Sequence, residues 1–152
     1  MKLTLDNAYM SDSYDQFRKY GSKRLLIERL IGTAFILAGI GFLTYMPGKT
    51  FLSSMLIIFG IFELCSNAIT KYFWLRRHTK SKLSNAEVQI NISESGIESI
   101  SPFSNGSFNW SGIEKIIRTP EGILVWPQKG MYWYFPEKIF GKETIDLIAS
   151  KM

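Results

Sequence analysis

The sequence of 152 residues contains a single cysteine and a single histidine, which narrows the chemistry it can support. Cys65 cannot form an internal disulfide, and it lies in an apolar stretch where the thiolate is disfavoured. His78 stands between Arg77 and Lys80 with no second metal ligand nearby, so a nucleophilic triad and a transition-metal site both lack parts. Neither Gly-x-Gly-x-x-Gly nor a Walker sequence is present. We therefore expect no enzyme activity, no cofactor and no metal.

Acidic residues are scarce in the first 85 residues, which contain 12 Lys or Arg against five Asp or Glu, a net charge of +7. Residues 86–152 contain six Lys or Arg against eight Asp or Glu, a net charge of −2. The positive charge therefore accompanies the apolar half of the chain. This distribution favours an anionic membrane surface as the electrostatic partner. It argues against nucleic acid, whose binding depends on neutralising phosphates.

Charge is also scarce in two long apolar segments. Residues 25–46 are enough, at about 1.5 Å per residue, to cross a bilayer core of roughly 30 Å as a helix. Residues 51–74 are equally long but include Glu63 and Lys71. The four residues 47–50 form a turn between them. We predict a transmembrane helical hairpin, and the alternative is a buried helical hairpin of a soluble domain.

Basic residues flank the outer ends of this hairpin, ten of them against Lys49 alone in the turn. The positive-inside rule places both termini in the cytoplasm, residues 1–24 as an N-terminal segment and residues 75–85 as a basic linker. The members of the predicted lipid-surface basic collar are Arg18, Lys19, Lys23, Arg24, Arg29, Arg76, Arg77, Lys80 and Lys82.

A polar stripe runs along the second predicted helix, within an arc of about 80° at 100° per residue. Its members are Ser53, Gly60, Glu63, Asn67 and Lys71. Glu63 would lie roughly 18 Å into the core, where an ionised carboxylate is costly. It is either a neutral acid hydrogen-bonded within the hairpin or a homodimer, which we favour, or an intramembrane switch or contact to a partner helix. Ala34, Ala38 and Gly41 form a small-residue face on the first helix that could receive the stripe.

Residues 86–152 change to the two-residue period of β-strands with one wet face. The predicted strands are 87–93, 97–100, 107–110, 113–118, 123–126 and 131–135. Asn105-Gly106 is a strong hairpin-turn signal, so we place a turn at 104–106. Short strands at this spacing indicate a strongly bent antiparallel sheet or partial barrel.

Both ends of the chain offer further elements to this sheet. Ile145, Ile148 and Met152 follow helical spacing and predict a final helix over 143–152 that closes the sheet at one end. Residues 1–5 alternate and can add an N-terminal strand, because both termini lie on one side of the membrane. The predicted fold class is thus a membrane α + β protein.

The aromatic residues of the last strands suggest a binding surface. Alternation sends Tyr132 and Tyr134 to one face of their strand and Trp133 to the other, so one set is core and the other is exposed or covered by something. We take Trp126, Tyr132, Trp133 and Tyr134 as the candidate partner surface.

The motifs also carry a resemblance. After two apolar helices come Ser93-Glu94-Ser95-Gly96-Ile97, then Phe108-Asn109-Trp110-Ser111-Gly112-Ile113-Glu114-Lys115-Ile116, and finally Phe135-Pro136-Glu137-Lys138-Ile139-Phe140. In this order they resemble the YcxB-like family over nearly the whole chain. The resemblance implies a bacterial membrane protein whose cytoplasmic C-terminal domain, residues 86–152, is similar to the pleckstrin-homology (PH) fold, with no common activity.

Two functions follow as expectations. The first is a non-enzymatic protein of the bacterial inner membrane whose PH-like domain binds a protein partner or its own copy, or serves as a membrane-proximal scaffold. The alternative is a membrane-embedded immunity protein or modulator that meets a toxin or a transporter through the hairpin and Glu63. A lipid-processing enzyme would need a reactive group that the sequence does not supply.

Overall fold

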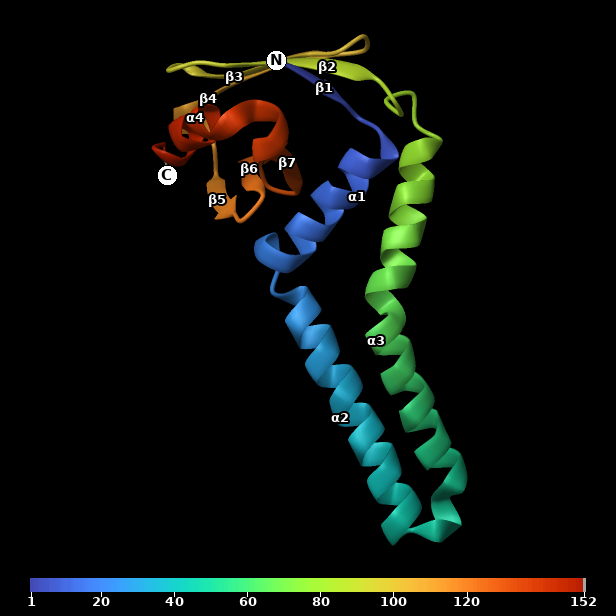
Figure 1. Cartoon of the computed structure of the whole chain (residues 1–152). Helices are drawn as coiled ribbons and strands as arrows, with labels where there is room; N and C mark the ends of the chain where they lie inside the picture. The colour runs from blue at the N-terminus through green and yellow to red at the C-terminus, as the bar shows by residue number, and fades with distance from the viewer. Residues whose placement is uncertain (152) are drawn as a thin grey trace. The chain divides into compact units, whose positions relative to one another are not determined.

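The computed structural model describes residues 1–151 (Figure 1), so Met152, which the sequence placed in the last helix, lies outside the described residues. The chain divides into two compact units. One consists of Ser22–Trp74 and contains the two long apolar helices. The other consists of Met1–Gly21 together with the chain from Leu75 onward, so it is built from both ends of the sequence.

The hairpin unit consists of α2 (Arg24–Tyr45), a short 3-10 turn (Pro47–Lys49) and the longer helix α3 (Thr50–Thr79), which extends past the unit's boundary. Both helices are long and apolar enough to cross a membrane. The helix α3 continues five residues beyond the predicted end at Trp74, so the expected linker at 75–85 is helical in its first half. Basic residues in that last turn suit a helix C-terminus, whose carbonyls carry partial negative charge.

The two helices pack through glycines rather than through the predicted Ala34, Ala38 and Gly41. A Cβ placed on Gly60 would lie 2.6 Å from the carbonyl oxygen of Gly32, so the backbones are in direct contact there. Gly39 makes a similar contact, 2.9 Å from such a Cβ to the carbonyl oxygen of Ser53. Ala34 and Ala38 are exposed, and nothing lies within 4 Å of a Cβ placed on Gly41. The spacing of small residues predicted a contact row on α2, but a second row on the same helix, Gly32 and Gly39, is the one that contacts α3.

The other unit contains a four-stranded antiparallel sheet in the order β1-β2-β3-β4. Its strands are β1 (Lys2–Thr4), β2 (Glu87–Ile92), β3 (Gly96–Ile100) and β4 (Asn105–Asn109). The N-terminal strand pairs with β2, Leu3 opposite Val88, so the alternating residues at the start of the chain do join the C-terminal sheet.

A second antiparallel sheet, in the order β5-β6-β7, follows. Its strands are β5 (Lys115–Thr119), β6 (Gly122–Gln128) and β7 (Met131–Pro136). The helix α4 (Glu137–Ala149) packs with both sheets around one core. Members of that core are Leu3, Val88, Ile90 and Ile97 from the first sheet, Ile123, Val125 and Phe135 from the second, and Phe140, Ile145 and Ile148 from α4.

The opposite face of the second sheet is covered by an element that the sequence did not reveal. The helix α1 (Asn7–Gln16) and the π-helix η1 (Phe17–Gly21) lie against it. Asp6 caps α1 by accepting a hydrogen bond from the backbone N–H of Tyr9 at 2.7 Å. Covered on both faces, β6 is buried from Gly122 to Val125, which explains why it reads as a continuous apolar run.

Two boundaries differ from prediction. The β3–β4 turn lies at Ser101–Ser104, and Asn105 and Gly106 belong to β4. Pro102 presets the turn conformation and the hydroxyl of Ser101 accepts from the N–H of Ser104 at 3.0 Å, which overrides the Asn-Gly signal. The last helix begins at Glu137 rather than at residue 143, and its first turn is bent away at Gly141, whose φ is 74°.

Candidate functional site

The polar stripe of α3 lies on the face that packs against α2. Ser53 is fully buried and Gly60 is in contact with Gly32, while Glu63, Asn67 and Lys71 continue the same row and are half-buried. Backbone contact at these glycines leaves no room for a side chain or a water-filled passage at their level. We call this packed interface between α2 and α3, which includes Gly32, Gly39, Ser53 and Gly60, the seam. It is closed to water at these residues.

A buried carboxylate lies on the α2 side of this seam. Glu28 is one turn from Gly32, is 8% exposed, and accepts from Nε of Arg24 at 2.9 Å. Because helical positions four apart share a face, the Glu28 side chain belongs to the same face of α2 as the Gly32 contact. The end of the seam near Arg24 is therefore polar, and the end near Gly39 and Ser53 is formed by small residues.

Hydroxyl groups on both helices bond to their own backbone. Thr33, Thr44, Ser53, Ser54 and Ser66 each donate to a carbonyl three or four residues earlier, at 2.7–3.2 Å. Such bonds satisfy a polar side chain without a partner from outside the helix. The hydroxyls of the hairpin are therefore compatible with an apolar environment.

The predicted collar is exposed except at one residue. Lys19, Lys23, Arg24, Arg29, Arg76, Arg77, Lys80 and Lys82 are all exposed. Arg18 is 8% exposed and lies in η1, within the unit that includes the sheets, so it does not offer its charge to a lipid surface. The predicted collar included Arg18 because α1 and η1 were not predicted from the sequence.

The predicted aromatic partner surface is covered by the chain itself. Phe17 of η1 stacks on Tyr132, with ring centroids 4.3 Å apart, and also contacts Trp126. Tyr9 stacks on Tyr134, which is 1% exposed. Trp133 lies on the other face of β7, half-buried and edge-on to Phe108 and Phe135. Tyr134 therefore belongs to the core, while Trp126, Tyr132 and Trp133 are half-buried by contacts within the chain and leave only part of their surface for a partner.

Beneath α1 the interface is partly polar. The hydroxyl of Tyr9 donates to the carbonyl of Tyr134 at 2.8 Å, and Nε2 of Gln16 donates to a carboxylate oxygen of Glu121 at 3.1 Å. Oε1 of Gln16 and Oγ1 of Thr119 are buried without a hydrogen-bond partner among residues 1–151. A docked helix with such groups is held less strongly than one with a fully apolar face.

Burial changes the acidity of the tyrosines in this interface. It raises the pKa of Tyr132 to about 12, against a hydrogen bond from Ser13 that lowers it. It also raises the pKa of Tyr134 to about 12, helped by the negative charges of Glu121 and Asp12. The pKa of Tyr9 is raised as well, mainly by burial. All three therefore remain neutral hydrogen-bond donors at physiological pH.

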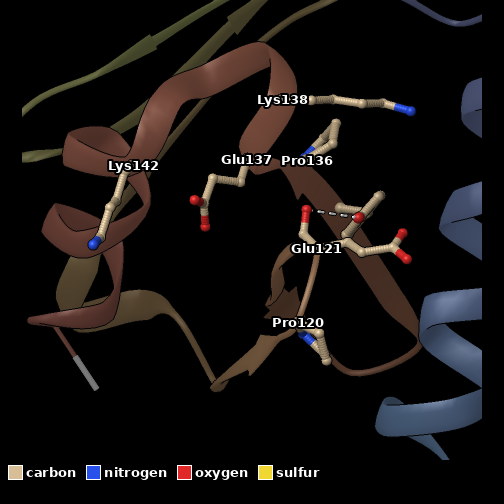
Figure 2. Close-up of a pocket in the computed structure, with 7 residues that line it drawn as sticks. Pro120, Glu121, Pro136, Glu137, Lys138 and Lys142 are labelled. Carbon is tan, nitrogen blue, oxygen red and sulfur yellow. Dashed lines mark hydrogen bonds between the residues drawn. The ribbon is translucent and has the colours of Figure 1, made fainter.

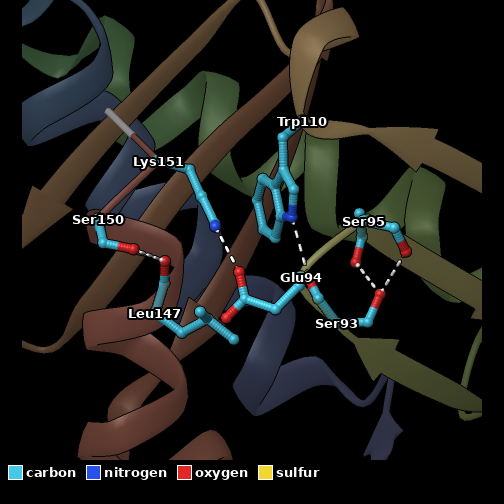
Figure 3. Close-up of polar contacts among 8 residues, drawn as sticks. Ser93, Glu94, Ser95, Trp110, Leu147, Ser150 and Lys151 are labelled. Carbon is cyan, nitrogen blue, oxygen red and sulfur yellow. Dashed lines mark hydrogen bonds and ion pairs between the residues drawn. The ribbon is translucent and has the colours of Figure 1, made fainter.

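Two of the three sequence motifs that carry the resemblance meet at the β2–β3 turn (Figure 3). The indole Nε1 of Trp110 donates to the carbonyl of Ser93 at 2.9 Å, which ties the β4 exit to the β2–β3 turn. Nζ of Lys151, just after α4, pairs with Glu94 in the same turn at 2.6 Å. The motif at the start of α4 places Phe135 and Phe140 edge-to-face in the core, 5.2 Å apart. Each motif therefore fixes a junction between strands or between a sheet and α4.

Comparison with known proteins agrees with this arrangement. Residues 92–151 match the family model described as YcxB-like protein. Residues 92–151 are therefore similar to a YcxB-like domain. No curated protein and no solved structure matches the chain. The match begins at the end of β2, so β1, α1 and most of β2 lie outside the matched residues although they belong to the same structural unit.

A shallow cleft of about 390 Å³ opens on the YcxB-like domain beside the start of α4 (Figure 2). The carbonyl of Glu121 accepts there from the hydroxyl of Tyr134 at 3.1 Å and from the N–H of Glu137 at 2.9 Å. Two glutamates and two lysines line the cleft, including Lys138, which pairs with Asp12 at 3.0 Å. No histidine or cysteine lines it, and no group of three His, Cys, Asp or Glu within residues 1–151 could hold a metal.

Proposed function

We propose that this protein is a two-helix membrane protein of the bacterial inner membrane that holds a PH-like, YcxB-like domain at the cytoplasmic face, where the domain acts by binding rather than by catalysis. The main observation behind this proposal is the exposed apolar surface of the hairpin, because such a surface is stable in a lipid bilayer and not in water. Sheet pairing, exposed basic residues and domain architecture each add support.

The helices α2 and α3 leave most of their apolar residues uncovered. Only 11% of the most apolar stretch of either helix is buried. Soluble proteins do not expose contiguous apolar surface on this scale, so a bilayer is the environment that the hairpin fits. The large exposed residues on α2 are Leu26, Ile27, Leu30, Ile31, Phe35, Leu37, Ile40 and Leu43, and those on α3 include Phe51, Leu52, Ile58, Phe59, Ile61, Phe62 and Ile69.

Pairing between β1 and β2 supports a topology with both termini on one side. The two strands are separated in sequence by the whole hairpin, yet Lys2 pairs with Gln89 and Leu3 with Val88. Strands in one sheet occupy one compartment, so a hairpin that leaves the membrane on the side it entered is required. The ten basic residues near the ends favour the cytoplasm as that side.

The eight exposed collar residues support contact with anionic lipid. Each basic residue near such a surface contributes about 1 kcal/mol at physiological ionic strength. This attraction is enough to hold the adjoining domain near the membrane without selecting a particular headgroup. The collar therefore attaches the protein to the membrane surface, and the domain is the part that recognises a specific partner.

The domain architecture supports a binding role. A four-stranded and a three-stranded antiparallel sheet closed by a C-terminal helix agree with the bent sheet expected of a PH-like domain. Three charged residues of the shallow cleft pair with residues outside it, Glu121 with Gln16, Glu137 with Arg118 and Lys138 with Asp12, an arrangement typical of a protein surface. For the alternative role as an immunity protein or modulator, the position of Glu63 on the side facing α2 favours a contact within the hairpin over one with an outside partner.

Fractionation and reporter fusions test the proposal. The untagged chain should sediment with membranes and resist extraction at alkaline pH. A periplasm-dependent phosphatase fused at Gly48 should be active, while the same reporter fused after residue 152 should be inactive and green fluorescent protein there should be bright. Recovery of the chain in the supernatant, or an active phosphatase at the C-terminus, would refute the membrane topology.

A further inference from the structure

The strand β4 has a free edge that differs from the other sheet edges of the domain. It pairs with β3 alone and ends its sheet. Proteins usually protect edge strands with charge, proline, irregular pairing or shortness, because open edges pair with other chains. β1 is three residues long and carries Lys2, and β5 carries Lys115 and Arg118. β7 has a register shift and ends in proline.

None of these protections is present in β4, whose sequence Asn105-Gly106-Ser107-Phe108-Asn109 has neither charge nor proline. Its backbone presents a defined set of groups outward. Hydrogen-bonded pairs alternate along an antiparallel ladder, and the N–H of Ser101 donates to the carbonyl of Ser104 at 3.0 Å. Hydrogen-bonded pairs recur every second residue from the Ser101–Ser104 pair, so the backbone groups of Gly106 and Phe108 bond to β3. Asn105, Ser107 and Asn109 therefore direct their N–H and C=O groups away from the sheet.

The side chains of β4 are self-complementary. In an antiparallel pair of two copies centred on Ser107, each Asn105 lies opposite the other copy's Asn109 and each Gly106 opposite the other copy's Phe108. An aromatic ring across from a glycine is a favourable cross-strand pair, which shields the glycine backbone. A Cβ on Gly106 would meet only two side-chain atoms within 4 Å, Oγ of Ser99 at 3.4 Å and the Phe108 ring of the same strand at 3.8 Å, so no backbone atom blocks this glycine. No like charges meet in this register.

We propose that the edge of β4 is a dimerisation site that takes β4 of a second copy, antiparallel about a two-fold axis at Ser107. The inference rests on the proposed binding role, because it names this chain itself as a partner. Ser107 and its counterpart would exchange both backbone hydrogen bonds, flanked on either side by the Asn105–Asn109 pairs. Five residues per strand make a small interface, and attachment to one membrane raises the effective concentration that such an interface needs.

Disulfide trapping in membranes tests the site. With Cys65→Ser as background, Ser107→Cys places two thiols across the axis, where opposite Cα atoms about 5.5 Å apart permit a disulfide. Asn91→Cys is the matched control, because Asn91 is exposed in the same cross-strand row on the interior strand β2. Mild oxidation should link Ser107→Cys to itself at least about tenfold more than Asn91→Cys.

A second set of variants tests the register without a thiol at the axis. Asn105→Cys combined with Asn109→Cys should also cross-link between copies. Adding Ser107→Lys, which opposes two cations at the axis, should reduce that product about tenfold, while adding Asn91→Lys should not.

Each outcome decides the proposal. Equal cross-linking of Ser107→Cys and Asn91→Cys would overturn it, as would insensitivity to Ser107→Lys. A product that links Ser107→Cys to a different protein would show that the edge receives another chain. If the protein is instead recovered in the supernatant, the membrane topology fails, and the same oxidation of the soluble chain still reports on the dimer.

Discussion

The glycine contact between α2 and α3 supports a quantitative prediction for Gly60→Leu. A Cβ at this position would lie 2.6 Å from both the carbonyl oxygen of Gly32 and Cγ1 of Ile36. The carbonyl belongs to the backbone and cannot move aside alone, so the helices must separate. Forcing extra atoms into a packed site costs about 1–3 kcal/mol.

Gly41→Leu provides the matched control on α2, since nothing lies within 4 Å of its Cβ. Leucine improves helix propensity by about 0.8 kcal/mol at either position, so the difference between the two variants isolates the packing. We expect Gly60→Leu to be less stable than Gly41→Leu by about 1–3 kcal/mol.

Titration of the detergent-solubilised chain with sodium dodecyl sulfate, followed by far-ultraviolet circular dichroism, measures this difference. Gly41→Leu should unfold at the same or a slightly higher denaturant fraction than the wild type. Equal shifts for both variants would mean that the helices do not meet at Gly32 and Gly60, and the closed seam would be refuted.

Two further predictions concern the domain. Burial raises the pKa of Tyr134 to about 12 in the folded chain, against about 10 when unfolded. The contribution of Tyr134 to stability should therefore be constant below pH 10 and fall between pH 10 and 12, by at most about 1.4 kcal/mol per pH unit. Tryptophan-monitored urea unfolding should show a shallower decline for Tyr134→Phe, and an unchanged decline would contradict the assignment. Gly141→Ala should lose about 1–3 kcal/mol, because φ 74° and ψ 158° define a backbone conformation that essentially only glycine adopts. Gly112→Ala, at ordinary φ and with open space, should change little in the same assay.

The strands were predictable because apolar and polar residues alternate along them, and this alternation shows directly which face of the sheet is exposed to solvent. All six predicted C-terminal strands are present within a few residues of their expected ends. In β2, Val88 and Ile90 are buried between exposed polar neighbours. The helices α2 and α3 were predictable for a similar reason, since length and lack of charge are properties of the segment itself.

Features that depend on what covers a surface were not predictable. The helix α1 is polar overall, and its buried residues include Ser13 and Gln16, so no apolar stripe marked it. Asp6 as an N-cap was the available signal. Without α1, the aromatic face under it reads as a partner surface, and Arg18 reads as a lipid contact. The low exposure of Arg18 and the contacts over Tyr132 and Tyr134 therefore have one cause, a tertiary contact between segments more than a hundred residues apart.

The strands β1 and β2 are also far apart in the sequence, and this distance sets the order in which the parts of the first sheet are synthesised. Residues 2–4 are synthesised before both long helices, yet the strand they pair with, Glu87–Ile92, is made only after them. The other three strands of the first sheet also follow the hairpin in the sequence, so β1 has no partner until both long helices have been made. On the proposed topology, a chain whose hairpin is wrongly threaded keeps Leu3 away from the core and leaves β2 paired with β3 alone, so the edge of β2 is open to other chains.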